Sequence, residues 1–160
     1  MGNHGATVSW ESDGNFRSGK YSRAHEWRFD GGAVVRGSSS PSVVPVPLSD
    51  PAGVDPEEAL IASASSCHML WFLALAQDAG LDVMSYCDEA VGVMGKDERG
   101  RIVLTRITLR PAIAFAGRQP DAGELAALHH DAHEKCFIAN SLRSEIVVEQ
   151  SGTAGSGSAA

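Results

Sequence analysis

Hydrophobic and polar positions alternate in short runs over the first part of the chain. Residues 6–36 contain several such runs separated by turns, and Asp30-Gly31-Gly32 marks the turn of a predicted β-hairpin. Residues 37–54 contain four prolines and several serines, so this segment is predicted to be a long irregular connection. Residues 81–116 predict further strands, and their apolar spacing slips by one position near Thr105, which indicates a β-bulge.

The clearest predicted element is a helix that begins near residue 55. Asp55 can cap its first turn, Pro56 suits the first helical position, and Gly80 ends it. Residues 69–76 are apolar all round, so we expect this helix to be buried in the middle of the structure. Such a helix is ~35 Å long. One domain of this size has too little chain to cover it on all sides, so the sequence favours a partner subunit.

A second predicted helix begins at Pro120-Asp121 and continues to about Ala139. Its apolar stripe consists of Leu125, Leu128, Ala132 and Cys136. Residues 144–149 predict a final strand. Because strands and helices are grouped along the chain rather than strictly alternating, the pattern favours an α+β fold over a parallel, doubly wound sheet.

Composition and charge narrow the class of protein. The 160 residues include 13 basic and 20 acidic side chains, and the net charge of −7 argues against a nucleic-acid partner. The start of the chain lacks the pattern of a signal peptide, and the longest apolar run, residues 69–76, is too short to cross a membrane. We therefore expect a cytoplasmic protein without a membrane partner, with one domain over residues 1–150 and a disordered Gly/Ser/Ala tail over residues 151–160.

Three cysteines are the first candidates for chemistry. Cys67 and Cys136 lie at apolar positions of the two predicted helices, where each is either a small core residue or a reactive thiol. Their sulfur atoms can meet if the two helices cross at these positions. Cys87 lies at the start of a predicted strand, and we expect a structural role for it.

A reactive thiolate needs a nearby positive charge. Arg23 and Arg28 lie in the early strands and Arg36 precedes the irregular connection, so each is a candidate. A solvent-exposed position is the simpler expectation for most of them. Glu57 lies ten residues before Cys67, which separates the two by ~15 Å along a straight helix. Glu57 could therefore position an arginine at the thiolate only through a bend or a second chain.

The histidines allow a metal-binding alternative. His129 and His133 are four residues apart and Cys136 follows three residues later, so the three could share a helix face, with His68 or Cys67 as a further ligand. The spacing matches no standard zinc signature, and exposed histidines are the simpler interpretation. We expect no bound metal.

Two motifs resemble those of a known family. Residues 55–62, Asp-Pro-Glu-Glu-Ala-Leu-Ile-Ala, followed by Ser65-Ser66-Cys67, resemble the cysteine-containing helix of the OsmC/Ohr family, in which the same ten-residue step joins a glutamate to a cysteine. Residues 136–141, Cys-Phe-Ile-Ala-Asn-Ser, resemble the segment that carries the second cysteine of that family. The grouping of strands and helices agrees with the family over residues 6–149.

The resemblance implies a fold, an assembly and an activity. The fold is an α+β, OsmC-like one, in which two long central helices are wrapped by antiparallel β-sheets in an intertwined homodimer with each active site at the subunit interface. The activity is that of a thiol-dependent peroxidase of the oxidative stress response, which reduces organic hydroperoxides, with hydrogen peroxide as a further candidate substrate. Cys67 is then the peroxidatic cysteine and Cys136 the resolving one, Glu57 holds the catalytic arginine, and Arg23 is the nearest counterpart of that arginine. An external dithiol completes the cycle, and no cofactor is needed.

The sequence also departs from the motifs of the family. His68 follows Cys67 where an aromatic residue is common, and Phe137 replaces a proline after Cys136, which indicates a distinct subgroup. The apolar neighbours of the cysteines are candidate substrate-binding residues that would favour organic hydroperoxides: Met69, Trp71, Phe72 and Phe137. The alternatives are a non-enzymatic stress or ligand-binding protein with the same fold, and the metal-binding module.

Overall fold

The computed structural model describes residues 2–149, so the predicted tail over residues 151–160 lies outside the described part of the chain. The chain forms two compact units, the first ending at Ala59 and the second beginning at Leu60. Helix α1, Pro56–Asp78, begins in the first unit and has most of its length in the second. Strands and helices are both present, as the predicted α+β class requires. The single domain over residues 1–150 stays a prediction.

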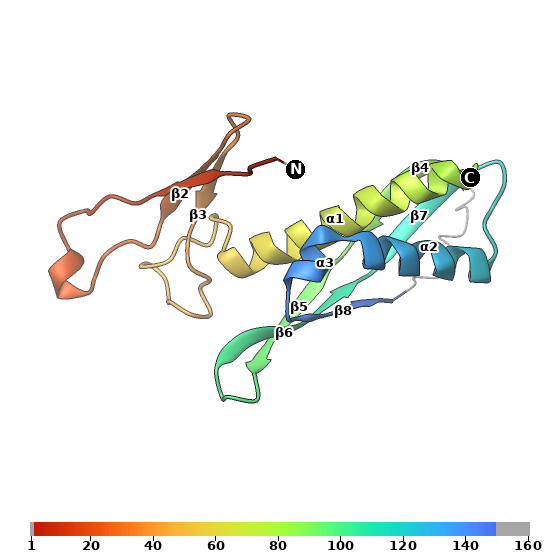
Figure 1. Ribbon diagram of the computed structural model, residues 1–160. Coiled ribbons are helices and arrows are strands. Elements are labelled where there is room, and N and C mark those ends of the chain that lie inside the picture. The colour runs from red at the N-terminus through yellow and green to blue at the C-terminus, as the bar shows by residue number, and fades with distance from the viewer. Residues whose placement is uncertain (1, 150–160) are drawn as a thin grey trace, which may run out of the picture. The chain divides into compact units, whose positions relative to one another are not determined.

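A three-stranded antiparallel sheet forms the regular part of the first unit (Figure 1). Its strands are, in order across the sheet, β1 (Ala6–Ser9), β2 (His25–Phe29) and β3 (Val34–Gly37). The predicted hairpin joins β2 to β3, and Gly32 in its turn adopts a left-handed φ of +86°. A short 3-10 helix, η1 (Phe16–Ser18), lies in the connection from β1 to β2.

Residues 38–55 contain no helix or named strand, as predicted, but hydrogen bonds hold this connection in place. Ser38 is fully buried, its Oγ accepts a hydrogen bond from the Asp50 N–H at 2.9 Å, and its own N–H donates to the Val54 carbonyl at 3.0 Å. Gly37 leaves no room for a side chain, because a Cβ there would lie 2.5 Å from His25 Nε2. The irregular connection is therefore fixed next to β3 rather than free.

Hydrogen bonds at both ends confirm the predicted limits of α1. Asp55 Oδ1 accepts from the Glu58 N–H at 2.8 Å, and Glu58 Oε2 accepts from the Asp55 N–H at 3.0 Å, which together form a capping box. After the last turn, Gly80 adopts φ +70° and its N–H donates to the Gln77 carbonyl at 2.9 Å. Local sequence therefore determines where this helix begins and ends.

The predicted burial of α1 on all sides is not found within the single chain. Its fully buried residues form one stripe at four-residue spacing: Ala64, His68, Phe72 and Ala76. Among the described residues, α1 is the one helix whose length and composition would allow it to cross a membrane, a test that a core helix of a soluble protein also passes. The uninterrupted apolar run of residues 69–76 is shorter than the apolar part of the helix, because the small residues before this run add little polarity. One covered stripe leaves apolar helix surface available to a partner.

The second unit contains two further sheets. Strands β4 (Asp82–Asp88) and β7 (Pro111–Ala116) form an antiparallel pair, and the other sheet consists of β5 (Val91–Lys96), β6 (Ile102–Leu109) and β8 (Glu145–Val148). The register of β5 and β6 passes from Val93–Arg106 to Met94–Leu104, so Thr105 is the extra residue of the predicted bulge.

The prediction of purely antiparallel sheets is wrong for β8, which pairs with β6 in parallel. The remaining strand pairs are antiparallel. The chain from the end of β6 to the start of β8 passes through β7 and the second long helix, and a crossover of this length permits a parallel neighbour.

Helix α2 ends earlier than predicted. Asp121 caps its start as expected, but the helix spans Ala122–Lys135, and a separate short helix, α3, spans Phe137–Ser141. Cys136 separates the two with extended backbone angles, φ −69° and ψ 110°. Its Sγ accepts a hydrogen bond from the Ala139 N–H at 3.3 Å, so this cysteine caps α3 instead of continuing α2.

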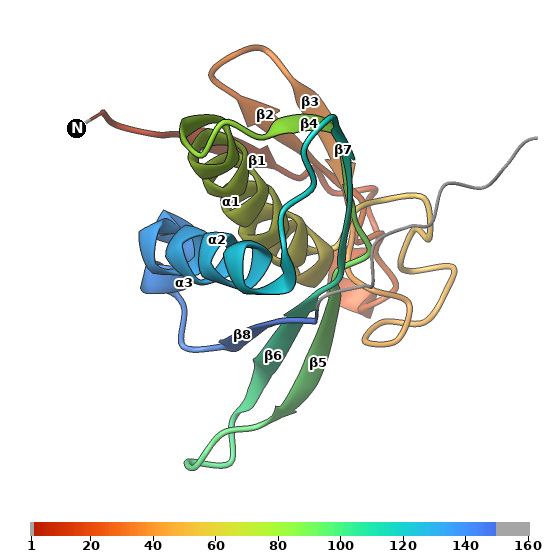
Figure 2. The ribbon, with the colours of Figure 1, turned by 90° about the vertical axis from the view of Figure 1, so that its right-hand side faces the viewer.

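Helices α1 and α2 lie side by side against the strands of the second unit (Figure 2). The buried cluster between the helices consists of Phe72, Ala76, Leu81, Leu128 and Ala132. A second buried cluster joins Ala64 of α1 to Ile107 and Leu109 of β6. These two clusters fix α1 against both α2 and the sheet, and they set the positions of the side chains described next.

Candidate functional site

The thiols of Cys67 and Cys136 are neighbours in the second unit, close enough for Cys67 to affect the ionisation of Cys136. Cys67, on α1, is partly exposed, whereas Cys136, between α2 and α3, is 1% exposed. Burial first, and then the hydrogen bond to Cys67, raise the pKa of the Cys136 thiol to about 11. Cys136 therefore keeps its proton at neutral pH.

Hydrogen bonds lie close to both cysteines. Ser65 Oγ on α1 donates a hydrogen bond to Asp88 at the end of β4 at 2.5 Å, and Asp88 also accepts from the Arg110 N–H at 2.6 Å. On the other side, the Ala139 N–H fixes the Cys136 side chain through its bond to Sγ. The contact that two crossing helices would allow is thus present, although Cys136 reaches it from a junction between helices.

A mainly apolar cavity of about 450 Å³ lies beside the Cys67 thiol. Two of the predicted substrate-binding residues line it, Trp71 and Phe137, whose rings meet edge to face with centroids 5.7 Å apart. Phe72 is not available there, because its side chain is fully buried in the cluster between the helices. Met69 does not line this cavity either.

A buried pair of histidines joins α1 to α2. His68 Nε2 and His129 Nδ1 are 3.0 Å apart, and the two side chains are 1% and 4% exposed. Burial is the largest cause that lowers the pKa of each imidazole to about 4, so both are neutral at pH 7. His68 Nδ1 has no hydrogen-bond partner among the described residues, which favours the tautomer in which His68 Nε2–H donates to His129.

The sequence alone does not indicate this pair. Exposed histidines are the simpler expectation for the second helix, and for His129 that expectation is wrong. The partner, His68, is 61 residues away in the sequence, and only the packing of α1 on α2 brings the two together. A histidine in the apolar stripe of α1 was the one available signal.

The described residues do not support the metal-binding alternative. Within residues 2–149, no three His, Cys, Asp or Glu side chains lie close enough together to hold a metal ion. His129 is paired with His68, and Cys136 is paired with Cys67, so the suggested ligands turn toward different partners.

The other predicted catalytic residues, Arg23 and Glu57, line a second cavity, of about 540 Å³, that lies within the first unit. The Arg23 guanidinium lies 3.6 Å from the centroid of the Tyr21 ring, and Nη1 donates to the Tyr21 carbonyl at 2.5 Å. Across residues 2–149, no ion pair joins Arg23 or Glu57 to a residue of opposite charge. The two predicted residues share a cavity without being paired.

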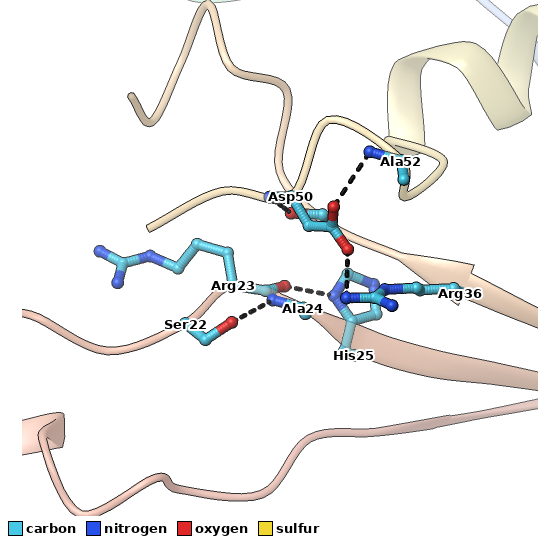
Figure 3. Close-up of polar contacts among 8 residues, drawn as sticks. Ser22, Arg23, Ala24, His25, Arg36, Asp50 and Ala52 are labelled. Atoms are coloured by element: carbon cyan, nitrogen blue, oxygen red, sulfur yellow. Dashed lines mark hydrogen bonds and ion pairs between the residues drawn. The ribbon is translucent and has the colours of Figure 1, made fainter. Parts of the chain in front are cut away.

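The other two candidate arginines are engaged with carboxylates. Arg36 pairs with Asp50 at 2.5 Å, and the Arg23 side chain extends away from this pair (Figure 3). Arg28 pairs with Glu26, two residues earlier on β2, at 2.6 Å. A guanidinium that is already paired with a carboxylate has less positive charge to offer a thiolate. Arg23 is therefore the best suited of the three.

Comparison with known proteins identifies the family. Residues 49–151 match the model of the family described as OsmC-like protein. An OsmC-like protein of unknown function from Vibrio cholerae is 49% identical in sequence, with a TM-score of 0.92 over 94% of this chain and 100% of that chain. The chain belongs to the OsmC-like family. The resemblance carried by the two cysteine motifs of this OsmC-like protein is thereby confirmed.

Proteins named for organic hydroperoxide resistance share the fold at lower identity. The one from Elizabethkingia anophelis is 19% identical to this OsmC-like protein, with a TM-score of 0.68 over 94% of each chain. OhrB of Bacillus subtilis is 17% identical, with a TM-score of 0.65 over 93% of this chain and 98% of that chain. At these identities the likeness establishes the fold. No curated protein matches the chain.

Proposed function

We propose that this OsmC-like protein is a thiol-dependent peroxidase that reduces organic hydroperoxides in preference to hydrogen peroxide. The observation that carries the proposal is the contact between a partly exposed thiol, Cys67, and a buried thiol, Cys136, beside an apolar cavity. That cavity favours a substrate with an organic group over a small polar peroxide. Organic hydroperoxide resistance proteins with the same fold support the reaction class.

The chemistry requires two thiols and one external dithiol. The Cys67 thiolate attacks the distal oxygen of the hydroperoxide, an S–O bond forms as the O–O bond breaks, and the departing alkoxide takes a proton and leaves as an alcohol. The Cys136 thiol then displaces water from the Cys67 sulfenic acid, which forms the disulfide. Exchange with an external dithiol restores both thiols. A cytoplasmic location, which we also propose, supplies dithiols in reduced form.

We infer that Arg23 and Glu57 serve the thiolate within an intertwined homodimer, with two long central helices wrapped by the sheets of both chains. Arg23 and Glu57 belong to the first unit, and the thiol pair belongs to the second. Apolar surface that a second copy would cover is present on both units, with Val8 66% exposed on β1, Leu70 63% on α1 and Phe137 69% on α3. The arginine would then stabilise the thiolate form of the partner's Cys67 by its positive charge and orient the peroxide.

A peroxide titration followed by peptide mapping tests the proposed reaction. We expect one equivalent of cumene hydroperoxide to consume two thiols of the reduced protein and to link Cys67 to Cys136. Cys87 should remain free, because it is exposed on β4 and the described structure pairs it with no other thiol. Hydrogen peroxide should react more slowly. Slow loss of thiols with both peroxides, or a different disulfide, would contradict the proposal.

Sedimentation tests the proposed dimer. The protein should sediment with twice the chain mass of 16.8 kDa. Leu70→Glu should produce the monomer, because it places a charge on the exposed apolar face of α1. Met84→Glu is the matched control, since Met84 is 67% exposed on β4, and it should leave the dimer intact. A wild-type monomer at micromolar concentration would reject the assembly without rejecting the thiol chemistry.

A further inference from the structure

Three aromatic rings line the cavity in the first unit. Trp10, Phe16 and Tyr21 contact one another pairwise, with ring centroids 5.0 to 5.7 Å apart. Trp10 Nε1–H donates to the Ser22 carbonyl at 2.8 Å, which fixes the orientation of the indole. The cluster is not closed off from ligands, since Phe16 is 56% exposed and Trp10 38% exposed. A packed cluster of rings with accessible faces is suited to contact another ring.

The cavity is also lined by polar groups of both charge signs, which lie beside the rings, since the Arg23 guanidinium is 3.6 Å from the centroid of the Tyr21 ring. It is lined by the Arg23 guanidinium, which has one hydrogen bond and no ion pair in the described part of the chain, and by the Glu57 carboxylate. Ser39 also lines this cavity, and its buried Oγ has no hydrogen-bond partner among the described residues. Buried polar atoms without partners are rare in proteins and indicate a missing ligand or water. These lining groups can therefore both donate and accept hydrogen bonds.

The combination determines the chemistry of a fitting ligand. A neutral group that accepts a hydrogen bond from Arg23 and donates one to Glu57 fits these side chains, and a hydroperoxide group does both. A carboxylate would be drawn to Arg23 but repelled by Glu57 in the same cavity. The volume of about 540 Å³ is in the range of small-molecule sites and accommodates a single ring with a short substituent.

We propose that this cavity selects hydroperoxides whose organic group is an aromatic ring, with Trp10, Phe16 and Tyr21 as the specificity-determining residues. The ring of the substrate packs on the aromatic cluster, while the hydroperoxide group lies toward Arg23 and Glu57. This inference rests on the proposed peroxidase function for its reaction, but the aromatic site itself can be tested without any turnover. All three rings come from the segment between β1 and β2. Neither Cys67 nor Cys136 lines this cavity.

Binding of an unreactive alcohol tests the aromatic site. The probe is 2-phenylpropan-2-ol, the alcohol formed from cumene hydroperoxide, and tert-butanol is its ring-free counterpart. In ligand-observed NMR titrations of the reduced full-length protein, the aromatic alcohol should bind and Phe16→Ala should weaken its binding about three- to tenfold. Phe29→Ala is the matched control, because Phe29 is 39% exposed on β2 and does not line the cavity. Equal effects of the two substitutions would overturn the proposal.

Turnover separates this proposal from the proposed function. The ratio of kcat/KM for cumene hydroperoxide to that for tert-butyl hydroperoxide should fall about three- to tenfold in Phe16→Ala and stay unchanged in Phe29→Ala. An unchanged ratio in an active Phe16→Ala enzyme would overturn the selection by the ring cluster and leave the peroxidase standing. The wild-type protein could bind the aromatic alcohol but lack peroxidase activity. If Phe16→Ala then weakens the binding, the result supports the aromatic site and rejects the peroxidase.

Discussion

Replacing Cys67 with serine should reduce the turnover of cumene hydroperoxide to the uncatalysed rate, a loss of about three orders of magnitude or more. A serine hydroxyl is not ionised at neutral pH, and it cannot form the sulfenic acid on which the cycle depends. The buried Cys136 cannot take over, because its pKa of about 11 keeps it protonated. A coupled assay with a dithiol reductant measures this loss directly.

Two further cysteine variants make the result specific. Cys136→Ser should still reduce about one equivalent of hydroperoxide and then stop, since Cys67 sulfenic acid forms but has no resolving thiol. Cys87→Ser should keep wild-type turnover, because Cys87 is exposed on β4. Normal turnover in Cys67→Ser would reject the peroxidase mechanism, while full multiple turnover in Cys136→Ser would reject only the resolving role.

Acid should destabilise the protein through the pair of His68 and His129. The pKa of each imidazole is about 4 in the folded protein and 6.5 as the ordinary value, so between these pH values the unfolded chain binds more protons. The pair's contribution to stability is complete above pH 6.5, falls as the pH decreases, and levels off below about 4. His133 lowers the pKa of His68 further and Asp88 opposes this, but burial is the largest cause.

Denaturant unfolding at pH 7 and pH 4.5 measures this effect. One pKa unit corresponds to about 1.4 kcal/mol, so each of the two imidazoles should lower the free energy of unfolding by about 3 kcal/mol at pH 4.5. The double variant His68→Leu/His129→Leu should lose this pH dependence. His130→Leu should retain it, because His130 is exposed on the same helix. If the double variant does not fold, NMR titration of wild-type imidazoles decides, and values near 6.5 would contradict the prediction.

The limits of α1 and the bulge in β6 could be predicted because each depends on residues that are close together in the sequence. Asp55 and Glu58 cap the helix through their own side chains, and Gly80 supplies the positive φ that ends it. The slip in apolar spacing near Thr105 follows directly from the alternation of side chains along a strand. The cysteine motifs likewise identified the family from consecutive residues.

Features that depend on packing between distant segments could not be predicted. The pattern of apolar positions predicts a helix that continues through Cys136. It does not show the break at this residue, because the break depends on the hydrogen bond by which the Cys136 Sγ caps α3. The partner of His68 lies on α2 and becomes a neighbour only when the two helices pack. Trp10 and Phe16 come from an irregular stretch in which no periodic pattern indicates a shared cavity.

The position of Cys136 gives its sulfur a second role, as the cap of α3. As a thiol, Sγ accepts the Ala139 N–H at the start of α3, a helix of only five residues. A disulfide sulfur is a poorer acceptor and must turn toward Cys67, so oxidation withdraws the cap from a helix too short to persist alone. Residues 137–141 would then fray when the protein is oxidised and reorder when it is reduced. The order of Phe137, which lines the cavity beside Cys67, would thus depend on the redox state of the protein.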